Sequence, residues 1–303
     1  KELATTWLAD ELLPFAYEAY TAMGELIGQP VISETPILAF PANAEMLQVY
    51  NKRIKEGSPW IHAVESPQAW EGIFNFLHQV VCLRPVYRVQ IGAMLQGWAS
   101  LLEKSDDIWL HHFDDQLLTV HDDGITYQGV HAKALLFCDG YHAEKSRFWQ
   151  GLPFSVNKGE ALIVDIPALP GEYIYKFGIT TLAPWSDGLW WVGSSYDNRF
   201  THPHPTEAFR RQMEFFLAQT LRVPFRITGH ICGLRPATIE RRPFAGLHAR
   251  YKQIGILNGL GTKGVSLAPW FARQLALHLI QGEPIDPAAN VQRFKRAFEK
   301  SMN

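Results

Sequence analysis

The stretch Ile254-Gly255-Ile256-Leu257-Asn258-Gly259-Leu260-Gly261-Thr262-Lys263-Gly264 decides the fold of this chain. Its first four residues are typical of a short strand, and the rest form a glycine-rich turn. Apolar residues then recur at intervals of three and four, which predicts a helix, at Leu267, Ala268, Phe271, Ala272, Leu275, Ala276, Leu279 and Ile280. Gly282 and Pro284 end it. A strand that leads through glycines into a helix N-terminus presents backbone N–H groups to an anion or a polarised oxygen.

A second segment lies upstream, at Gly233-Leu234-Arg235-Pro236-Ala237-Thr238. Its glycine and proline predict a constrained turn that carries Arg235. A guanidinium binds a carboxylate through two parallel, charge-assisted hydrogen bonds. Pairing of Arg235 with a structural Asp or Glu remains the alternative. Together the two segments predict a cofactor turn beside a carboxylate-binding arginine.

Further segments occur in the order of a known family, namely Leu135-Leu136-Phe137-Cys138-Asp139-Gly140, Lys158-Gly159-Glu160-Ala161-Leu162, Trp190-Trp191-Val192-Gly193-Ser194 and Arg242-Pro243-Phe244-Ala245-Gly246. With the two segments above, they resemble the D-amino-acid-oxidase-type (DAO) FAD-dependent oxidoreductases. Glycine oxidase-like and sarcosine oxidase-like members are the nearest. The resemblance covers most of the chain and is most specific from residue 158 to 282.

The resemblance implies an α/β (α+β) fold with two interleaved domains. One is an FAD-binding domain of the glutathione-reductase-like type, and the other is a substrate domain built on an antiparallel sheet. We expect residues 1–28, 87–153 and 230–303 to form the FAD-binding domain, which is discontinuous and incomplete. Residues 29–86 and 154–229 are expected to form the substrate-binding domain.

The start of the chain departs from the family. Its members open with a βαβ unit whose G-x-G-x-x-G turn holds the FAD pyrophosphate, followed by an acidic residue for the ribose. Here the chain runs from Lys1 at once into a helical pattern. Gly259–Gly264 has the glycine spacing, but no second strand or acidic residue follows its helix. We therefore expect an N-terminal βαβ unit of at least about thirty residues to be absent, and FAD to be weakly bound or absent in this chain alone.

The resemblance also implies the roles of individual residues. Arg235 would hold the substrate carboxylate, and non-covalently bound FAD would contact six residues of the turn: Gly259, Leu260, Gly261, Thr262, Lys263 and Gly264. Backbone donors there would stabilise negative charge that develops towards flavin N1 and the C2 carbonyl. Two alternatives stay open: Lys263 is equally consistent with a solvent-facing loop lysine, and Thr262 with a helix cap.

The expected activity is oxidation of the C–N bond of a small amino acid or secondary amine, by hydride transfer to flavin N5. Dioxygen or another electron acceptor would reoxidise the cofactor. Where glycine oxidase-like relatives place a pocket tyrosine, this chain has Thr180-Thr181-Leu182-Ala183-Pro184, which argues against glycine as the substrate. Two other interpretations remain: the oxidoreductase half of a tRNA-uridine-modifying enzyme, which has a similar G-L-R-P-A-T segment, and a non-catalytic fragment without flavin.

Composition excludes several other classes of protein. A chain of 303 residues with 47% hydrophobic and 13% aromatic content is a globular protein, long enough for two domains. Its net charge of −2 argues against a general nucleic-acid or anionic-membrane binder, and no apolar run reaches the roughly eighteen residues of a membrane span. Three widely spaced cysteines without C-x-x-C favour a reducing, cytoplasmic location and no metal site.

Three expectations concern the sheets and helices. The apolar run Leu135–Cys138 predicts a buried central strand, in one sheet with residues 254–257. Residues 162–164 and 189–192 are expected in a second, antiparallel sheet. Pro205-Thr206 predicts the start of a helix.

Overall fold

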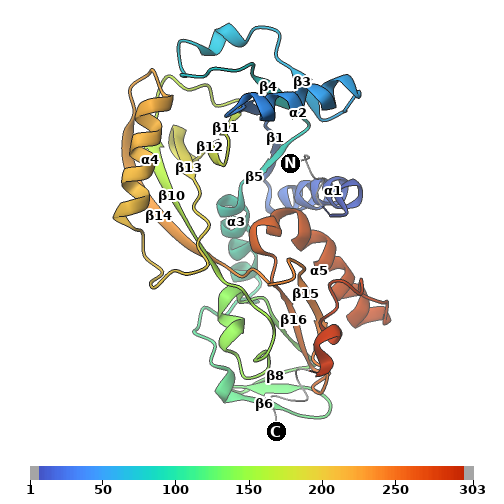
Figure 1. The fold of residues 1–303 in the computed structure, drawn as a ribbon. Coiled ribbons are helices and arrows are strands. Elements are labelled where there is room, and N and C mark those ends of the chain that lie inside the picture. The colour runs from blue at the N-terminus through green and yellow to red at the C-terminus, as the bar shows by residue number, and fades with distance from the viewer. Residues whose placement is uncertain (1–6, 297–303) are drawn as a thin grey trace. The chain divides into compact units, whose positions relative to one another are not determined.

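The computed structural model describes residues 7–296. Residues 1–6 and 297–303, which fall in the expected FAD-binding domain, lie outside that range. The described residues divide into two compact units (Figure 1): unit 1 contains Trp7, Ile32–Gln90 and Lys158–Gly233, and unit 2 contains Leu8–Val31, Ile91–Asn157 and residues 234–296. Each unit is therefore assembled from separate stretches that alternate along the chain.

Unit 1 is built on an eight-stranded sheet with the order β14-β10-β13-β12-β11-β2-β4-β3. Its strands are β2 (Ile37–Phe40), β3 (Ile61–Ala63), β4 (Val81–Leu83), β10 (Asn157–Asp165), β11 (Ile174–Phe177), β12 (Thr180–Pro184), β13 (Leu189–Gly193) and β14 (Arg226–Arg235). β11 pairs with β2 in parallel. β10 pairs with β13 in the antiparallel sense, with Leu162 opposite Val192, which confirms the expected antiparallel sheet.

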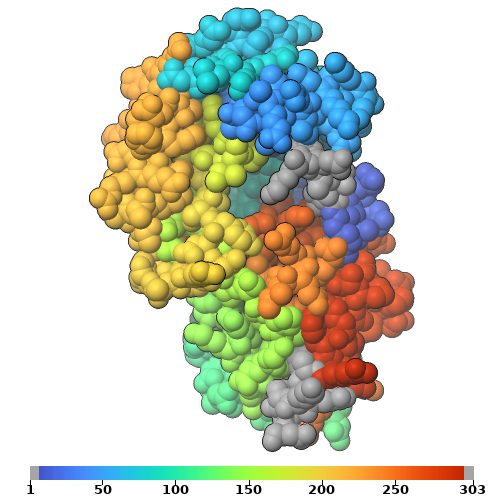
Figure 2. All heavy atoms as spheres, in the orientation of Figure 1, coloured from blue at the N-terminus to red at the C-terminus, as the bar shows by residue number. Residues whose placement is uncertain are grey.

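The helices of unit 1 are α2 (Ala44–Lys55) and α4 (Glu207–Thr220). A two-stranded ribbon joins β1 (Ile32–Glu34) to β5 (Tyr87–Val89). α4 begins as predicted, because the Thr206 hydroxyl caps it by accepting a hydrogen bond from Phe209 N at 3.3 Å. α4 lies beside the sheet (Figure 1). Its apolar face has helical spacing and packs into the core of the sheet through Phe209, Met213 and Leu217. The opposite face of α4 lies at the molecular surface (Figure 2).

Unit 2 contains α1 (Ala9–Ile27), α3 (Ile91–Lys104) and α5 (Gly264–Gln281). α1 contacts both α3 and α5. Its two three-stranded sheets have the orders β15-β16-β9 and β6-β7-β8. The strands are β6 (Leu118–Val120), β7 (Ile125–Tyr127), β8 (Val130–Ala132), β9 (Leu135–Phe137), β15 (Phe244–Leu247) and β16 (Ile254–Asn258). No helix among residues 7–296 is both long enough and apolar enough to cross a membrane.

β9 meets one expectation and fails another. It pairs in parallel with β16, with Leu135 opposite Ile254, so the two strands share a sheet despite their separation in the sequence. However, β9 is the last strand in that sheet among the described residues, and Leu136 is 38% exposed. The expectation of a buried central strand was wrong, because an apolar run indicates a strand but cannot tell how many strands flank it.

Candidate functional site

The glycine turn lies between β16 and α5, as the sequence predicts. β16 ends at Asn258, and α5 begins at Gly264. Gly259 and Gly261 have φ angles of 73° and 56°, in the left-handed region that favours glycine. A Cβ atom on Gly259 would lie 2.5 Å from Thr238 Cγ2. The backbone conformation and the lack of space therefore both require glycine at this position.

The turn contacts the segment that follows β14. Gly261 N donates a hydrogen bond to Pro236 O at 3.1 Å, and a Cβ atom on Gly261 would meet Ala237 Cβ at 3.4 Å. Ala237 N in turn donates to Arg235 O at 2.8 Å. The two segments that the sequence singles out are thus in contact within unit 2, where Gly261 meets Pro236 and Ala237.

The N-terminus of α5 has no side-chain cap. Its N-cap residue, Lys263, makes no capping hydrogen bond, and the Ser266 hydroxyl donates to Lys263 O at 3.1 Å. The side chains of Thr262 and Lys263 are exposed. The first N–H groups of a helix have no partner within the helix, and the helix dipole adds positive potential there. This end of α5 is therefore suited to an oxygen that carries partial or full negative charge.

Arg235 is the last residue of β14, so its expected position on a turn was wrong. A residue before proline favours an extended backbone, and the strand continues until Pro236. Arg235 NH1 donates to Asn157 Oδ1 at 2.6 Å, and Asn157 is fully buried. Because an amide oxygen is neutral, this bond orients the guanidinium without neutralising it. Sequence reasoning missed Asn157, although it directly precedes the family-like segment that begins at Lys158.

The carboxyl ends of the parallel strands β9 and β16 carry further polar groups. The buried Asn258 side chain donates to Gly140 O at 2.8 Å and lies 3.4 Å from Asp139 Oδ1. Its own oxygen accepts from Gly259 N at 2.8 Å, which fixes the start of the glycine turn. Burial raises the pKa of the Asp139 carboxyl above its ordinary value. Ligands of open α/β sheets bind beyond the carboxyl ends of parallel strands, so Asn258 and Asp139 are site candidates that sequence reasoning missed.

A buried charged cluster in unit 1 was also missed. Lys158 Nζ lies 3.1 Å from Glu160 Oε1 and donates to His204 O at 2.9 Å. Glu160 also accepts hydrogen bonds from the backbone N–H and the hydroxyl of Thr206. His230 Nε2 lies 3.1 Å from Glu160 Oε2, but outside hydrogen-bond geometry. The cluster ties β10 to the start of α4.

Comparison with known proteins identifies the family. Residues 107–277 match the model of the DAO family, described as FAD dependent oxidoreductase. Glycine oxidase from Geobacillus kaustophilus superimposes with a TM-score of 0.74 at 17% identity, over 93% of this chain and 82% of that chain. Iminodiacetate oxidase from Chelativorans sp. BNC1 superimposes with a TM-score of 0.70 at 19% identity, over 94% of this chain and 83% of that chain. L-proline dehydrogenase from P. horikoshii superimposes with a TM-score of 0.72 at 16% identity, over 94% of this chain and 83% of that chain. These structures confirm the expected mixed α/β fold.

Proposed function

Because the chain belongs to the DAO family of FAD-dependent oxidoreductases, we propose that it oxidises the C–N bond of a small amino acid or secondary amine. The observation that carries this proposal is the contact between the glycine turn and the segment of Arg235. The names of three structurally similar proteins support the substrate class, since glycine, iminodiacetate and L-proline are all amines that bear a carboxylate. The domain roles expected from the sequence are also proposals: unit 2 for the cofactor and unit 1 for the substrate.

The glycine turn fits the flavin end of FAD. Gly259 and Gly261 have positive φ and let the backbone turn sharply, and no side chain caps the N-terminus of α5 that follows. The residues that would hold the cofactor are Gly259, Leu260, Gly261, Thr262, Lys263 and Gly264. When bound, FAD supplies the hydride acceptor at N5. The backbone donors of the turn would stabilise negative charge on the ring.

Arg235 would bind the substrate carboxylate through its guanidinium fork. Asn157 holds NH1 at 2.6 Å, so the fork is oriented before the substrate arrives. Fixing the carboxylate orients the α C–H bond of the substrate, which is the main contribution that such a residue makes to the rate. The substrate amine must lose a proton before its α-hydrogen leaves as hydride, and water then hydrolyses the imine product.

Substitution of Arg235 in the flavin-loaded enzyme tests the proposal. Arg235→Ala should raise KM for an amine with a carboxylate by roughly ten- to a hundredfold, because a charged hydrogen bond contributes about 1.5–3 kcal/mol. KM for an amine without a carboxylate should change far less. Arg235→Lys should restore little, because an ammonium cannot reproduce the planar fork. Flavin content should stay the same.

Arg226→Ala provides a matched control, because Arg226 lies on the same strand with its side chain 77% exposed. It should leave both KM values unchanged. Equal losses on both amines in Arg235→Ala, with flavin retained, would mean that Arg235 is structural. An absorbance spectrum of the purified protein separates the proposal from the non-catalytic fragment, which would hold no flavin.

A further inference from the structure

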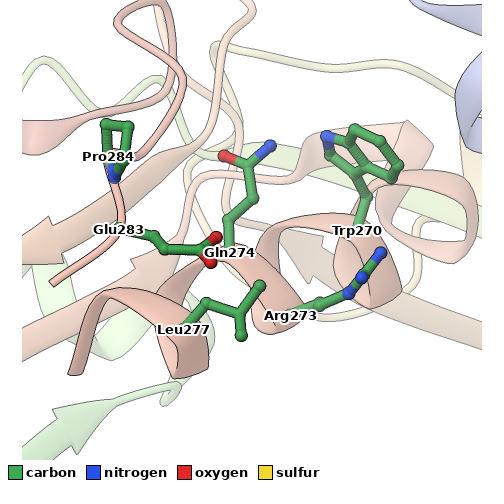
Figure 3. A pocket seen from close by; sticks show the side chains of 6 residues that line it. All are labelled: Trp270, Arg273, Gln274, Leu277, Glu283 and Pro284. Atoms are coloured by element: carbon green, nitrogen blue, oxygen red, sulfur yellow. The ribbon is translucent and has the colours of Figure 1, made fainter. Parts of the chain in front are cut away.

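Two regions outside the glycine turn carry charged side chains that the proposed function does not use. One is a pocket of about 240 Å³ along the C-terminal half of α5 (Figure 3), beside Arg273 and Glu283. Both side chains are exposed, so water solvates their charges. The other is one face of the unit 1 sheet, where Lys176 of β11 is only partly exposed. A charge that has lost part of its hydration needs a compensating partner, and this distinguishes Lys176 from the charges along α5.

The pairing of the strands shows which face of the sheet Lys176 occupies. Residues opposite each other in neighbouring strands point to the same face, and successive residues along a strand alternate between the two faces. One row of opposed residues lies in the apolar core of unit 1 and consists of Leu38, Tyr175, Leu182, Val192 and Leu162. Lys176 directly follows Tyr175, so its side chain points away from that core.

The row that contains Lys176 holds two polar side chains next to each other. Its members are Ala39, Lys176, Thr181, Gly193 and Ala161. Thr181 of β12 lies directly opposite Lys176, and the Cβ atoms of such a pair are about 4.5–5.5 Å apart. The other three side chains are a hydrogen atom or a methyl group. The Lys176 ammonium and the Thr181 hydroxyl can therefore reach the same ligand.

Neither polar group has a partner within residues 7–296. The Lys176 ammonium and the Thr181 hydroxyl make no hydrogen bond there, and Lys176 makes no ion pair. The next row on the same face supplies no carboxylate either, since it consists of Ile37, Ile174, Ala183, Trp191 and Ile163. Burial lowers the pKa of Lys176 below its ordinary value, which is the effect expected for an ammonium that no anion compensates.

We infer that Lys176 and Thr181 determine specificity by binding a second carboxylate, on the side chain of the substrate. The inference rests on the proposed function, in which Arg235 binds the α-carboxylate and unit 1 serves the substrate. The Lys176 ammonium pairs with the side-chain carboxylate, and the Thr181 hydroxyl donates a hydrogen bond to it. The preferred substrate is then an amine with two carboxylates. This agrees with the position of Thr181 in Thr180–Pro184, the segment that argues against glycine as the substrate.

Two probes that differ only in the side-chain carboxylate test this inference. 2-Methylaspartate and 2-aminoisobutyrate both carry an α-ammonium and an α-carboxylate. Neither has an α-hydrogen, so neither can be oxidised at the α-carbon. Isothermal titration calorimetry on the full chain supplied with FAD should give a Kd about tenfold lower for 2-methylaspartate, because this probe makes an additional charged hydrogen bond.

Substitutions assign this preference to the two residues. Lys176→Met keeps the apolar stem and removes the charge, so the variant should fold and should bind both probes with similar Kd values. Thr181→Val should reduce the ratio of the two Kd values by about threefold, because it removes one hydrogen bond. Lys176→Arg keeps the charge and should retain most of the preference. Lys55→Met, which replaces an exposed lysine on α2, should leave it unchanged.

The outcomes separate this inference from the proposed function. Arg235→Ala should raise both Kd values by the same factor and leave their ratio unchanged, because both probes carry the α-carboxylate. Equal Kd values in the native protein, or a preference that persists in Lys176→Met, would contradict the role of Lys176 while the effect of Arg235→Ala stands. Binding of neither probe, or no effect of Arg235→Ala, would overturn the proposed function and this inference with it.

Discussion

α4 and α5 begin in opposite ways. At the start of α4, the Thr206 hydroxyl accepts from Phe209 N, and the buried Glu160 carboxylate accepts from the N–H and the hydroxyl of Thr206. At the start of α5, no side chain caps the helix, and a glycine turn precedes it. We call the first a closed N-terminus and the second an open one. At a closed N-terminus a side chain of the protein accepts from the first N–H groups, whereas at an open one no side chain does.

The charges of the two regions differ in the same way. At the closed end, Lys158 and Glu160 are only 2% and 3% exposed and neutralise each other. Burial raises the pKa of the Glu160 carboxyl, but hydrogen bonds from Thr206 and the charge of Lys158 outweigh it and lower that pKa below its ordinary value. At the open end, the chain supplies an exposed lysine, Lys263, and no carboxylate cap. The negative charge there would come from a ligand.

The largest expected effect comes from disrupting the closed N-terminus of α4. Glu160→Ala leaves the Lys158 ammonium buried without its carboxylate, and loss of one partner of a buried pair costs about 3–5 kcal/mol. Urea unfolding measures this loss. Asp165→Ala is the control, because its partner Arg226 is 77% exposed and such pairs contribute about 0–1 kcal/mol. Similar losses in the two variants would mean that the buried cluster does not secure α4.

The next largest effect comes from a substitution in the glycine turn that precedes the open N-terminus of α5. Gly259 and Gly282 have φ angles of 73° and 74°, so alanine costs roughly 1–2 kcal/mol at either position. Nothing lies within 4 Å of a Cβ atom on Gly282, whereas one on Gly259 would meet Thr238 Cγ2 at 2.5 Å, adding about 1–3 kcal/mol. Gly259→Ala should therefore unfold at lower urea than Gly282→Ala, and it alone should lose flavin. Equal flavin content in the two variants would mean that the glycine turn does not contact the cofactor.

Acid should weaken the closed end more than the open one. Because the pKa of Glu160 is lowered in the folded protein, its contribution to stability is complete above the unfolded pKa of about 4.3 and is lost as the pH falls through the folded value. Urea midpoints between pH 6 and pH 3 should fall more steeply for the native chain than for Glu160→Gln. Parallel curves would show that the pKa of Glu160 is the same in the folded and the unfolded protein.

The sequence predicted the elements whose signals are local. The strand, glycine turn and helix from Ile254 onward were confirmed, and so was the start of α4 at Thr206. Each depends on neighbouring residues: an apolar run, glycines that adopt positive φ, or a hydroxyl three residues before the N–H that it caps. The family resemblance was confirmed because its segments keep their order along most of the chain.

What the sequence missed depends on contacts between distant residues. Thr206 lies 46 residues from Glu160, and Asn157 lies 78 residues from Arg235. No periodicity or residue spacing in the sequence indicates such pairs, because only the folded structure brings the two residues together. The edge position of β9 was missed for the same reason, since its neighbours come from elsewhere in the chain. The roles of Arg235 and of the glycine turn remain predictions.

The smallest expected effect converts the open end towards a closed one. Lys263 is the N-cap residue of α5 and is exposed, so Lys263→Asp would place a carboxylate beside the first N–H groups of the helix. A carboxylate at this position stabilises a helix by about 0.3–1 kcal/mol, and the apoprotein should gain that much in urea unfolding. The same charge would repel negative charge on the flavin ring, so flavin affinity should fall, and both effects should shrink as salt screens them. Lys252→Asp, an exposed lysine in a turn, should change neither quantity. A gain in stability with unchanged flavin affinity would mean that the open N-terminus of α5 does not face the cofactor.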